Sequence, residues 1–274
     1  GLNCSHFDVT ELNNLKKDND PNFSLFHLNI SSLPYHFEEL ENLLKVIKFK
    51  FKIIGITESR LKKNIQPLNN IDLKGYKIEH TATESEKGGS LLYISSDLNY
   101  KVRNDLRMYK AKELESVFIE VINKDKKNSI IGCVYKHPNM TIKEFNDDFI
   151  VPVIEKITSE KKECFLLGDF NINLLNYESD NSTSEFINDL CSNSFVPYIN
   201  IPTRITPRSK TLIDNIFYNE INENIVTGNL TTDISDHLAQ IFIKPTTKTP
   251  QEIPKMRRRN FKHFEIENFK EDLG

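Results

Sequence analysis

Short apolar runs that end in a polar residue recur along this chain, and they constrain its fold more than any other feature. Residues 53–57 and 164–168 are too short for helices and lack the alternation of a half-exposed strand, so each predicts a strand buried on both faces. Further runs predict strands over residues 24–30, 90–95, 116–122, 129–135, 211–218 and 238–243. Of these, residues 90–95, 116–122 and 129–135 are predicted to be consecutive strands of one sheet. Strands of this kind need a core on both sides of a sheet.

Helical spacing occurs between some of these strands. In residues 37–49 the side chains of Phe37, Leu40, Leu43, Leu44 and Ile47 fall on one face. Residues 145–157 and 185–191 also predict helices, the first with a kink at Pro152. Many strands with few helices predict an α/β fold: a four-layer sandwich of two mixed sheets flanked by helices.

Charge is spread unevenly over the 274 residues. Residues 244–274 hold eight Lys/Arg and five Asp/Glu, a net charge of +3, so the remainder carries −6 of the total of −3. An acidic body does not bind a polyanion passively, and contact with nucleic acid must go through local basic patches and bound cations. No apolar run approaches the ~18 residues of a membrane span, which predicts a soluble protein without a membrane partner.

Cysteine usage and missing motifs exclude other classes. The four cysteines are dispersed and form no Cys-x-x-Cys, which favours reduced thiols and an intracellular setting; they are Cys4, Cys133, Cys164 and Cys191. The chain lacks zinc-site spacings, His-Glu-x-x-His, a P-loop, Gly-x-Ser-x-Gly and a dinucleotide glycine fingerprint.

Three segments differ in texture. Residues 1–22 are polar and predict an N-terminal lead-in, and residues 23–244 hold the predicted strands and helices of one domain. Residues 245–274 begin with Pro-Thr-Thr-Lys-Thr-Pro and continue through a basic run into an amphipathic stretch, which predicts a linker toward a further domain.

Polar side chains stand where the buried runs end. A carboxylate beside an apolar strand is costly unless it is paired, hydrogen-bonded or bound to a metal. Junctions between strands and loops are also where rigid scaffolds carry catalytic groups. One convergent site is therefore predicted from Asn29, Glu58, Asp169, Asn171, Asp214, Asp236 and His237.

Each of these residues also has a structural interpretation. Glu58 could pair with Arg60 or Lys62, residues 169–171 could form an Asx-type turn, and Asn29 or Asp236 could cap a turn. The other histidines have no acidic neighbour in a comparable sequence setting and are predicted to be structural: His6, His27, His36, His80, His137 and His263.

The order of these motifs is specific. It runs Leu28-Asn-Ile30, Gly55-Ile-Thr-Glu58, Val134-Tyr135, Leu167-Gly-Asp-Phe-Asn171, Leu212-Ile-Asp214 and Ser235-Asp-His237. Over residues 23–243 it resembles the endonuclease/exonuclease/phosphatase superfamily, whose fold is the deoxyribonuclease I-like sandwich. With Pro202-Thr-Arg-Ile-Thr206 and Thr211-Leu-Ile-Asp-Asn-Ile216, it resembles more narrowly the apurinic-type endonuclease domain of non-LTR (LINE-like) retrotransposon proteins.

The resemblance implies a Mg²⁺-dependent phosphodiesterase, with Mn²⁺ as a substitute. Glu58 would hold the ion with Asn29 and Asp236 nearby, because carboxylate and other oxygen ligands suit hard cations. The remaining roles would be a phosphate contact or proton transfer by His237 oriented by Asp214, positioning of water by Asp169 and Asn171, and a hydrogen bond from Tyr135 to a phosphate oxygen.

A basic segment precedes Asp214 and carries no acidic residue. Since its C-terminal part delivers Asp214 to the site, we expect Arg204, Arg208 and Lys210 to stand beside the bound DNA and to read its shape. Thr203 and Ser235 are expected to join the phosphate-side network.

The resemblance implies nicking of double-stranded DNA in the nucleus, leaving a 3′-hydroxyl that a fused reverse transcriptase would extend. Alternatives are an abasic-site repair endonuclease, a hydrolase of lipid or small phosphate esters, or a catalytically inactive DNA-binding module. The presence of Glu58, Asp169, Asp214 and His237 argues against the last of these. Ser31 stands where some repair enzymes of the superfamily have an acidic residue, which leaves the number of metal ions open.

Overall fold

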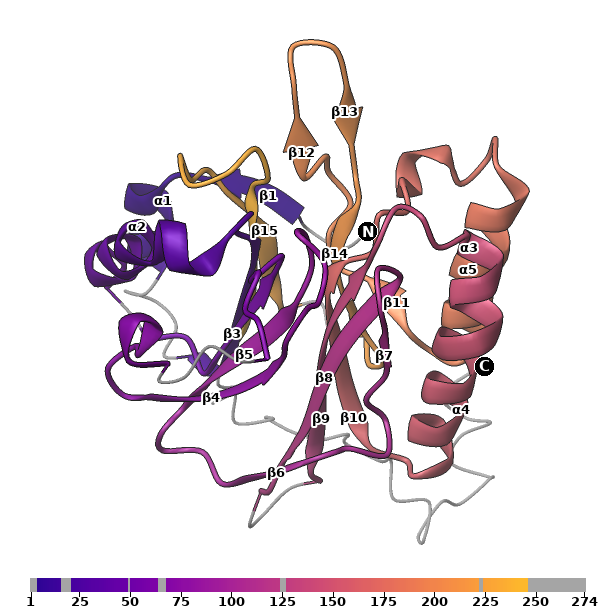
Figure 1. The fold of residues 1–274 in the computed structure, drawn as a ribbon, viewed down its shortest axis with the longest axis horizontal. Helices are drawn as coiled ribbons and strands as arrows, with labels where there is room; N and C mark the ends of the chain where they lie inside the picture. The colour runs from indigo at the N-terminus through magenta and orange to yellow at the C-terminus, as the bar shows by residue number, and fades with distance from the viewer. Residues whose placement is uncertain are drawn as a thin grey trace, which may run out of the picture.

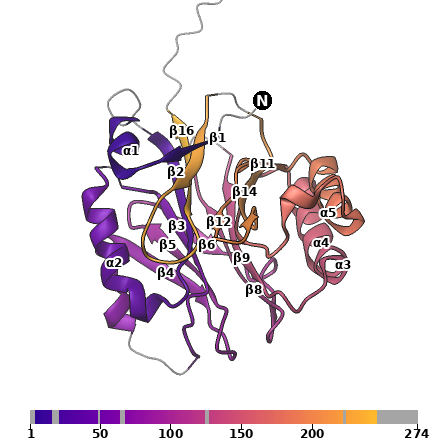
Figure 2. The ribbon, with the colours of Figure 1, turned by 90° about the horizontal axis from the view of Figure 1, so that it is seen from above.

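Two β-sheets pack face to face, and helices cover the outer face of each sheet. The computed structural model describes residues 4–15, 21–48, 50–63, 68–123, 127–221 and 224–245. Figures 1 and 2 show the resulting four layers, with one group of helices on each side of the paired sheets. The predicted four-layer sandwich of two mixed sheets is confirmed.

The first sheet has seven strands and includes the first and last strands of the described chain. Its order is β1 (Cys4–Phe7), β15 (Val226–Leu230), β16 (Ala239–Pro245), β2 (Pro21–Asn29), β3 (Ile53–Thr57), β5 (Ser90–Ser95) and β4 (Tyr76–Thr81). The pairs β1–β15 and β2–β3 are parallel, and the other neighbours are antiparallel.

The second sheet is also mixed, with one parallel pair, β9–β10, near its middle and antiparallel pairs elsewhere. Its order is β11 (Val196–Pro197), β14 (Asp214–Tyr218), β10 (Glu163–Asp169), β9 (Ser129–Lys136), β8 (Leu114–Val121) and β6 (Tyr100–Val102), with β7 (Tyr109–Lys110) also pairing with β8. A separate ribbon of β12 (Arg204–Ile205) and β13 (Lys210–Thr211) projects beyond the sheets at the top of Figure 1.

Helices α1 (Val9–Leu15) and α2 (Leu33–Val46) lie on the first sheet, and α3 (Ile142–Phe145), α4 (Val151–Ser159) and α5 (Asn181–Ser192) lie on the second (Figure 2). Single turns are η1 (Leu68–Ile71), η2 (Asn146–Ile150) and η3 (Leu174–Asn176). Thr141 and Glu144 form a capping box at the start of α3, and the Asp180 side chain caps α5.

Three apolar clusters fill the spaces between the layers. One joins α1 and α2 to the first sheet, a second joins α3, α4 and α5 to the second sheet, and the third lies between the sheets. In the third cluster Phe165 stacks on Tyr218 with ring centroids 4.3 Å apart. Strands in the middle of each sheet are therefore covered on both faces, as their continuous apolar runs predict.

One edge of the sandwich collects the polar strand ends. The carboxyl ends of the parallel strands β2 and β3 meet there, as do those of β9 and β10. Strands β14 and β16 run antiparallel to β10 and β2, so they begin at this same edge, with Asp214 directly opposite Asp169. The alternation of parallel and antiparallel pairs thus brings six separate stretches of chain to one place.

Several predicted elements differ in detail from the observed ones. Residues 4–15 lie in the predicted lead-in, yet β1 extends the first sheet by pairing with β15, and Leu12 of α1 is buried in the core. Strand β5 belongs to the first sheet rather than beside β8, because β8 and β9 start the second sheet. The predicted strand over 211–218 is divided between β13 and β14.

The helix predicted over 145–157 contains a π-helical turn. Residues 142–145 are α-helical, 146–150 form the π-helical η2, and α4 follows with Pro152 in its first turn. Proline lacks the N–H that a continuous helix would need, so the ladder changes register just before it. Within the described residues no helix is long and apolar enough to span a membrane. Residues 246–274 of the predicted linker lie outside the described residues.

Candidate active site

A polar cavity of about 270 Å³ lies at the shared edge of the two sheets. Residues from both sheets and from the loops beside them line it: Asn29, Ser31, Glu58, Lys87, Tyr135, Pro138, Asp169, Asn171, Arg204, Asp236 and His237. The predicted catalytic residues therefore converge, apart from Asp214, which lies directly behind His237.

Glu58 reaches the cavity from the turn after β3, where its backbone has a φ of +48°. Its Oε1 accepts hydrogen bonds from Tyr135 Oη at 3.1 Å and from Asn29 Nδ2 at 3.2 Å. Its Oε2 lies 3.3 Å from Arg60 Nη2. The pairing with Arg60 that a purely structural role predicts is present, but Glu58 also connects the two sheets.

Asp169 ends β10 and is 1% exposed. Its Oδ2 accepts a hydrogen bond of 2.8 Å from Asn29 Nδ2, and its Oδ1 accepts one of 2.9 Å from the Asn171 N–H in an Asx-type turn. Gly168 before it is required sterically, because a Cβ there would lie 1.9 Å from the Val134 carbonyl oxygen. The close approach of β9 and β10 therefore places the carboxylate.

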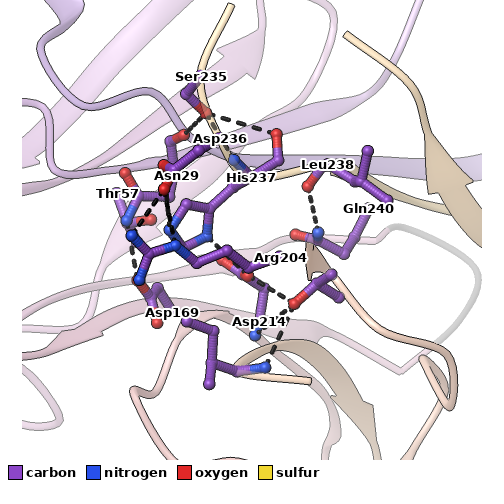
Figure 3. A network of polar contacts seen from close by, with 12 residues as sticks. Asn29, Thr57, Asp169, Arg204, Asp214, Ser235, Asp236, His237, Leu238 and Gln240 are labelled. Atoms are coloured by element: carbon purple, nitrogen blue, oxygen red, sulfur yellow. Dashed lines mark hydrogen bonds and ion pairs between the residues drawn. The ribbon is translucent and has the colours of Figure 1, made fainter. Parts of the chain in front are cut away.

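His237 and Asp214 form a buried pair (Figure 3). His237 Nδ1 donates to Asp214 Oδ2 over 2.9 Å, which leaves Nε2 on the cavity side, 3.9 Å from Asp236 Oδ1. Thr203 Oγ1 donates to the same Asp214 oxygen at 2.7 Å. These bonds fix the orientation of the imidazole ring.

Burial and mutual charge shift the pKa values of this group. Burial, together with the neighbouring Asp214, raises the pKa of Asp169 to about 7. Burial alone would lower the pKa of His237, but the Asp214 carboxylate and its hydrogen bond raise it to about 9. Burial opposes ionisation of Asp214, yet His237 holds the Asp214 pKa below its usual value. The pair is therefore ionic at neutral pH, and Asp169 is poised to exchange a proton.

Asp236 and Arg204 form an exposed ion pair at the mouth of the cavity, as Figure 3 shows. Arg204 Nη2 lies 2.6 Å from Asp236 Oδ2. The backbones of Arg204 and His237 also form an isolated antiparallel β-bridge. Asp236 is predicted as a metal ligand, and one of its two carboxylate oxygens, Oδ2, is already paired with Arg204. Arg208 and Lys210 are exposed on the β12–β13 ribbon and do not line the cavity.

Thr203 and Ser235 lie behind the lining. Thr203 is fully buried, and its Oγ1 accepts from the N–H groups of Ile213 and Asp214 besides donating to Asp214. Ser235 Oγ donates to the Asn29 carbonyl at 2.6 Å (Figure 3). Both hydroxyls hold site residues in place in this structure, while their predicted contact with phosphate stays a prediction.

The donor set fits a divalent cation. One ligand atom each from Asp169, Asp214 and His237 lies within 4.8 Å of the others, but a charged His237 has no lone pair for a cation, so the carboxylates would supply the ligands. In the described part of the chain, the buried Asp214 Oδ1 has no hydrogen-bond partner, which leaves an oxygen free for a ligand. Glu58 and Asn29 provide further oxygens in the same cavity. Oxygen-rich sites of this kind suit hard cations such as Mg²⁺ and Mn²⁺.

Sequence reasoning missed several residues around the site. Lys87 and Pro138 line the cavity, and the only signals were the Gly88-Gly89 pair after Lys87 and the position of Pro138 shortly after Tyr135. His137, predicted to be structural because the sequence places no acidic residue in a comparable position beside it, has an acidic partner in space, since its ring lies 2.7 Å from Glu115. That carboxylate is on a neighbouring strand, 22 residues away in sequence.

Comparison with known proteins places the fold. No family model and no curated protein matches the chain. Among solved structures, it is similar to the endonuclease domain of TRAS1, a telomere-specific non-LTR retrotransposon, at 14% identity and a TM-score of 0.57, covering 82% of this chain and 99% of that one. The AP endonuclease LMAP from Leishmania major has 12% identity and a TM-score of 0.61, with coverage of 84% and 90%.

A third neighbour is an endonuclease/exonuclease/phosphatase family protein from Leptotrichia buccalis, at 13% identity and a TM-score of 0.55, covering 81% of this chain and 99% of that one. At such identities the likeness establishes the fold. The protein has the same deoxyribonuclease I-like sandwich as these neighbours, as the sequence motifs predicted.

Proposed function

We propose that this protein is a divalent-metal-dependent endonuclease that nicks double-stranded DNA and leaves a 3′-hydroxyl. The observation that carries the proposal is the convergence of the His237–Asp214 pair, Asp169 and Glu58 on one cavity between the sheets. Hydrolysis of a phosphodiester can use groups of this kind: the carboxylates of Asp169 and Asp214, whose pKa values are raised and lowered, an oriented histidine, and oxygen ligands for a cation.

The chain's own residues divide the chemistry. A bound Mg²⁺ would neutralise charge on the phosphate and polarise it. Asp169, whose pKa is about 7, would accept the proton of the attacking water, and His237 would donate to a phosphate oxygen. Burial raises the pKa of Tyr135, so its hydroxyl stays protonated and can hydrogen-bond the transition state. Attack on phosphorus would break its bond to the 3′ oxygen, which would take up a proton from water and leave as the 3′-hydroxyl, with the phosphate remaining on the 5′ end of the other fragment.

The retrotransposon role rests on three observations. Ser31, and not a carboxylate, stands beside Glu58 and accepts from Arg60 Nη2 at 3.0 Å. A basic ribbon projects beside the cavity, where Arg208 and Lys210 are free of acidic neighbours in its sequence. The TRAS1 domain is similar over nearly its whole length. We therefore propose that the 3′-hydroxyl primes a fused reverse transcriptase on nuclear DNA.

Plasmid nicking tests the activity. Supercoiled plasmid incubated with protein and Mg²⁺ or Mn²⁺ should become open-circular before it becomes linear, and EDTA should stop the reaction. The Glu58→Ala variant is the matched negative control. Equal nicking by the wild type and this variant would assign the activity to a contaminant and contradict the proposal.

An abasic-site repair enzyme is the second candidate, since the AP endonuclease from Leishmania major shares the fold. Intact and abasic duplexes of one sequence separate the two functions. We expect a preference for abasic DNA below a hundredfold, which corresponds to about 2.7 kcal/mol. A larger preference would favour the repair function, and the absence of cleavage on either duplex would favour a DNA-binding module.

A further inference from the structure

A second buried histidine–carboxylate pair lies behind the cavity wall. His137 Nε2 is 2.7 Å from Glu115 Oε2, and the two residues are 5% and 0% exposed. Glu115 is on β8, and His137 directly follows β9. Neither residue lines the cavity, so the pair has no direct access to a substrate there.

The Gly88–Gly89 turn lies directly on this pair. A Cβ at Gly88 would be 2.7 Å from His137 Nε2 and 2.9 Å from both carboxylate oxygens of Glu115. Gly88 also has a φ of +110°, which other residues rarely adopt. The pair and the turn are therefore in close contact, with no room for a side chain between them.

The same turn holds the backbone beside Glu58. The Ser59 N–H donates to the Gly89 carbonyl at 3.2 Å, and the Arg60 N–H donates to the Gly88 carbonyl at 2.9 Å. Glu58 and Arg60 have φ values of +48° and +54°, a region that non-glycine residues occupy only when their surroundings enforce it. The two hydrogen bonds supply that enforcement.

The pair also touches Tyr135. Glu115 is the cross-strand partner of Tyr135 in the β8–β9 register. The His137 ring meets the Tyr135 ring edge-on, with centroids 4.7 Å apart and an interplanar angle of 71°. Tyr135 Oη in turn donates to Glu58 Oε1. The pair thus contacts both ends of the hydrogen bond between Tyr135 and Glu58, one directly and the other through the glycine turn.

We propose that His137 and Glu115 are positioning residues that set the Tyr135–Glu58 hydrogen bond for the reaction; the inference rests on the proposed function. Stability alone does not account for the pair, because a buried pair of polar side chains is often no more stabilising than apolar side chains of the same volume. Within the described chain Glu115 Oε1 has no hydrogen-bond partner, which makes the arrangement costlier still.

The Glu115→Gln variant tests the proposal against Glu120→Gln. Glu120 is a matched control because it is also on β8 and 1% exposed, but it lies at the far end and pairs with Arg103 and Lys162. We expect Glu115→Gln to lower kcat on a labelled duplex at least tenfold with KM within twofold, and Glu120→Gln to change neither, even if both lower Tm. An unchanged kcat in Glu115→Gln overturns the proposal.

Two further measurements separate positioning from a general loss of structure. Amide hydrogen exchange at Ser59 and Arg60 should accelerate at least tenfold in Glu115→Gln and stay unchanged in Glu120→Gln; this readout holds even if the protein does not cut DNA. In a Tyr135→Phe background, Glu115→Gln should cost less than twofold in kcat, because the interaction it supports is gone.

His137→Gln, which keeps an N–H donor, is the second variant, read by the same assays if Glu115→Gln fails to fold. It should retain kcat better than His137→Phe. Equal kcat for the two variants, or unaltered exchange at Ser59 and Arg60 in His137→Phe, would overturn the positioning role.

Discussion

Two histidine–carboxylate pairs of nearly equal burial lie at the same end of this sandwich, and only one of them faces the cavity. The histidines of both pairs are 5% exposed, the carboxylates are fully buried, and the N–O distances are 2.9 Å for His237–Asp214 and 2.7 Å for His137–Glu115. His237 uses Nδ1 for its carboxylate and keeps Nε2 on the cavity side. His137 uses Nε2 and is covered by Gly88.

This difference shows that burial and pairing do not identify a reacting group. The two histidines differ in that His237 has a second ring nitrogen, Nε2, on the cavity side. Asp214 keeps His237 charged and oriented toward the cavity, whereas Glu115 and the glycine turn enclose His137. Under the proposed function the first pair would exchange a proton with the substrate, and the second would act only through the residues that it contacts.

The largest expected effect lies at the cavity-facing pair. His237→Ala and Asp169→Ala should each lower the nicking rate by about a hundredfold to ten-thousandfold, the range for loss of one acid–base group. His36→Ala, which removes a histidine paired with Glu39 on α2, is the control and should cut like the wild type. Wild-type rates in both His237→Ala and Asp169→Ala would remove the distinction between the two pairs.

The pH dependence of stability sharpens the comparison. The pKa values of His237 and Asp169 are raised to about 9 and about 7, so the folded protein binds more protons than the unfolded one. The free energy of unfolding should therefore fall as pH rises, through about 7 for Asp169 and about 9 for His237. The lowered pKa of Asp214 acts only at acidic pH and does not oppose this trend near neutrality.

Thermal melts in EDTA between pH 6 and pH 9.5 (roughly the window of these pKa values) measure the effect. Tm of the wild type should decline, and His237→Phe should show a flatter profile above neutrality. A wild-type Tm that rises over this range would show that the cavity-facing pair is not ionic.

A smaller effect is expected from the basic ribbon. Replacing residues 204–210 by a Gly/Ser loop should scatter nick positions on a sequenced duplex while part of the catalysis remains, because under the proposed function the ribbon would contact DNA and His237 would take part in the chemistry. Arg208→Ala and Lys210→Ala should each lower the salt dependence of binding by about one unit of slope. Lys101→Ala on β6 is the control. An unchanged nick map would make the ribbon a structural hairpin.

The smallest effect should follow removal of residues 246–274. Strand β16 completes the first sheet by Pro245, so the cooperative melt and the nicking rate should stay as in the full chain. DNA affinity should fall slightly through loss of Arg257, Arg258 and Arg259. Loss of the cooperative melting transition would show that these residues belong to the core.

Local sequence was enough to predict much of the fold and of the site. Strands such as β3 and β10 are continuous apolar runs, and polar residues at their ends are visible without knowledge of the pairing. Strands β4 and β15 escaped prediction because Tyr76–Thr81 and Val226–Leu230 alternate weakly and owe their strand form to neighbours. The prediction of a lead-in likewise missed β1, because its partner strand, β15, lies more than 200 residues further along the chain.

The sequence by itself determined which residues are apolar enough to be buried and which polar groups stand at the ends of those runs, because both are properties of a few consecutive residues. The tertiary structure decided strand order, the sheet to which β5 belongs, and the meeting of His137 with Glu115 beneath Gly88. Such contacts depend on register between segments far apart in the chain, and register is set by the packing of the whole core rather than by any one segment.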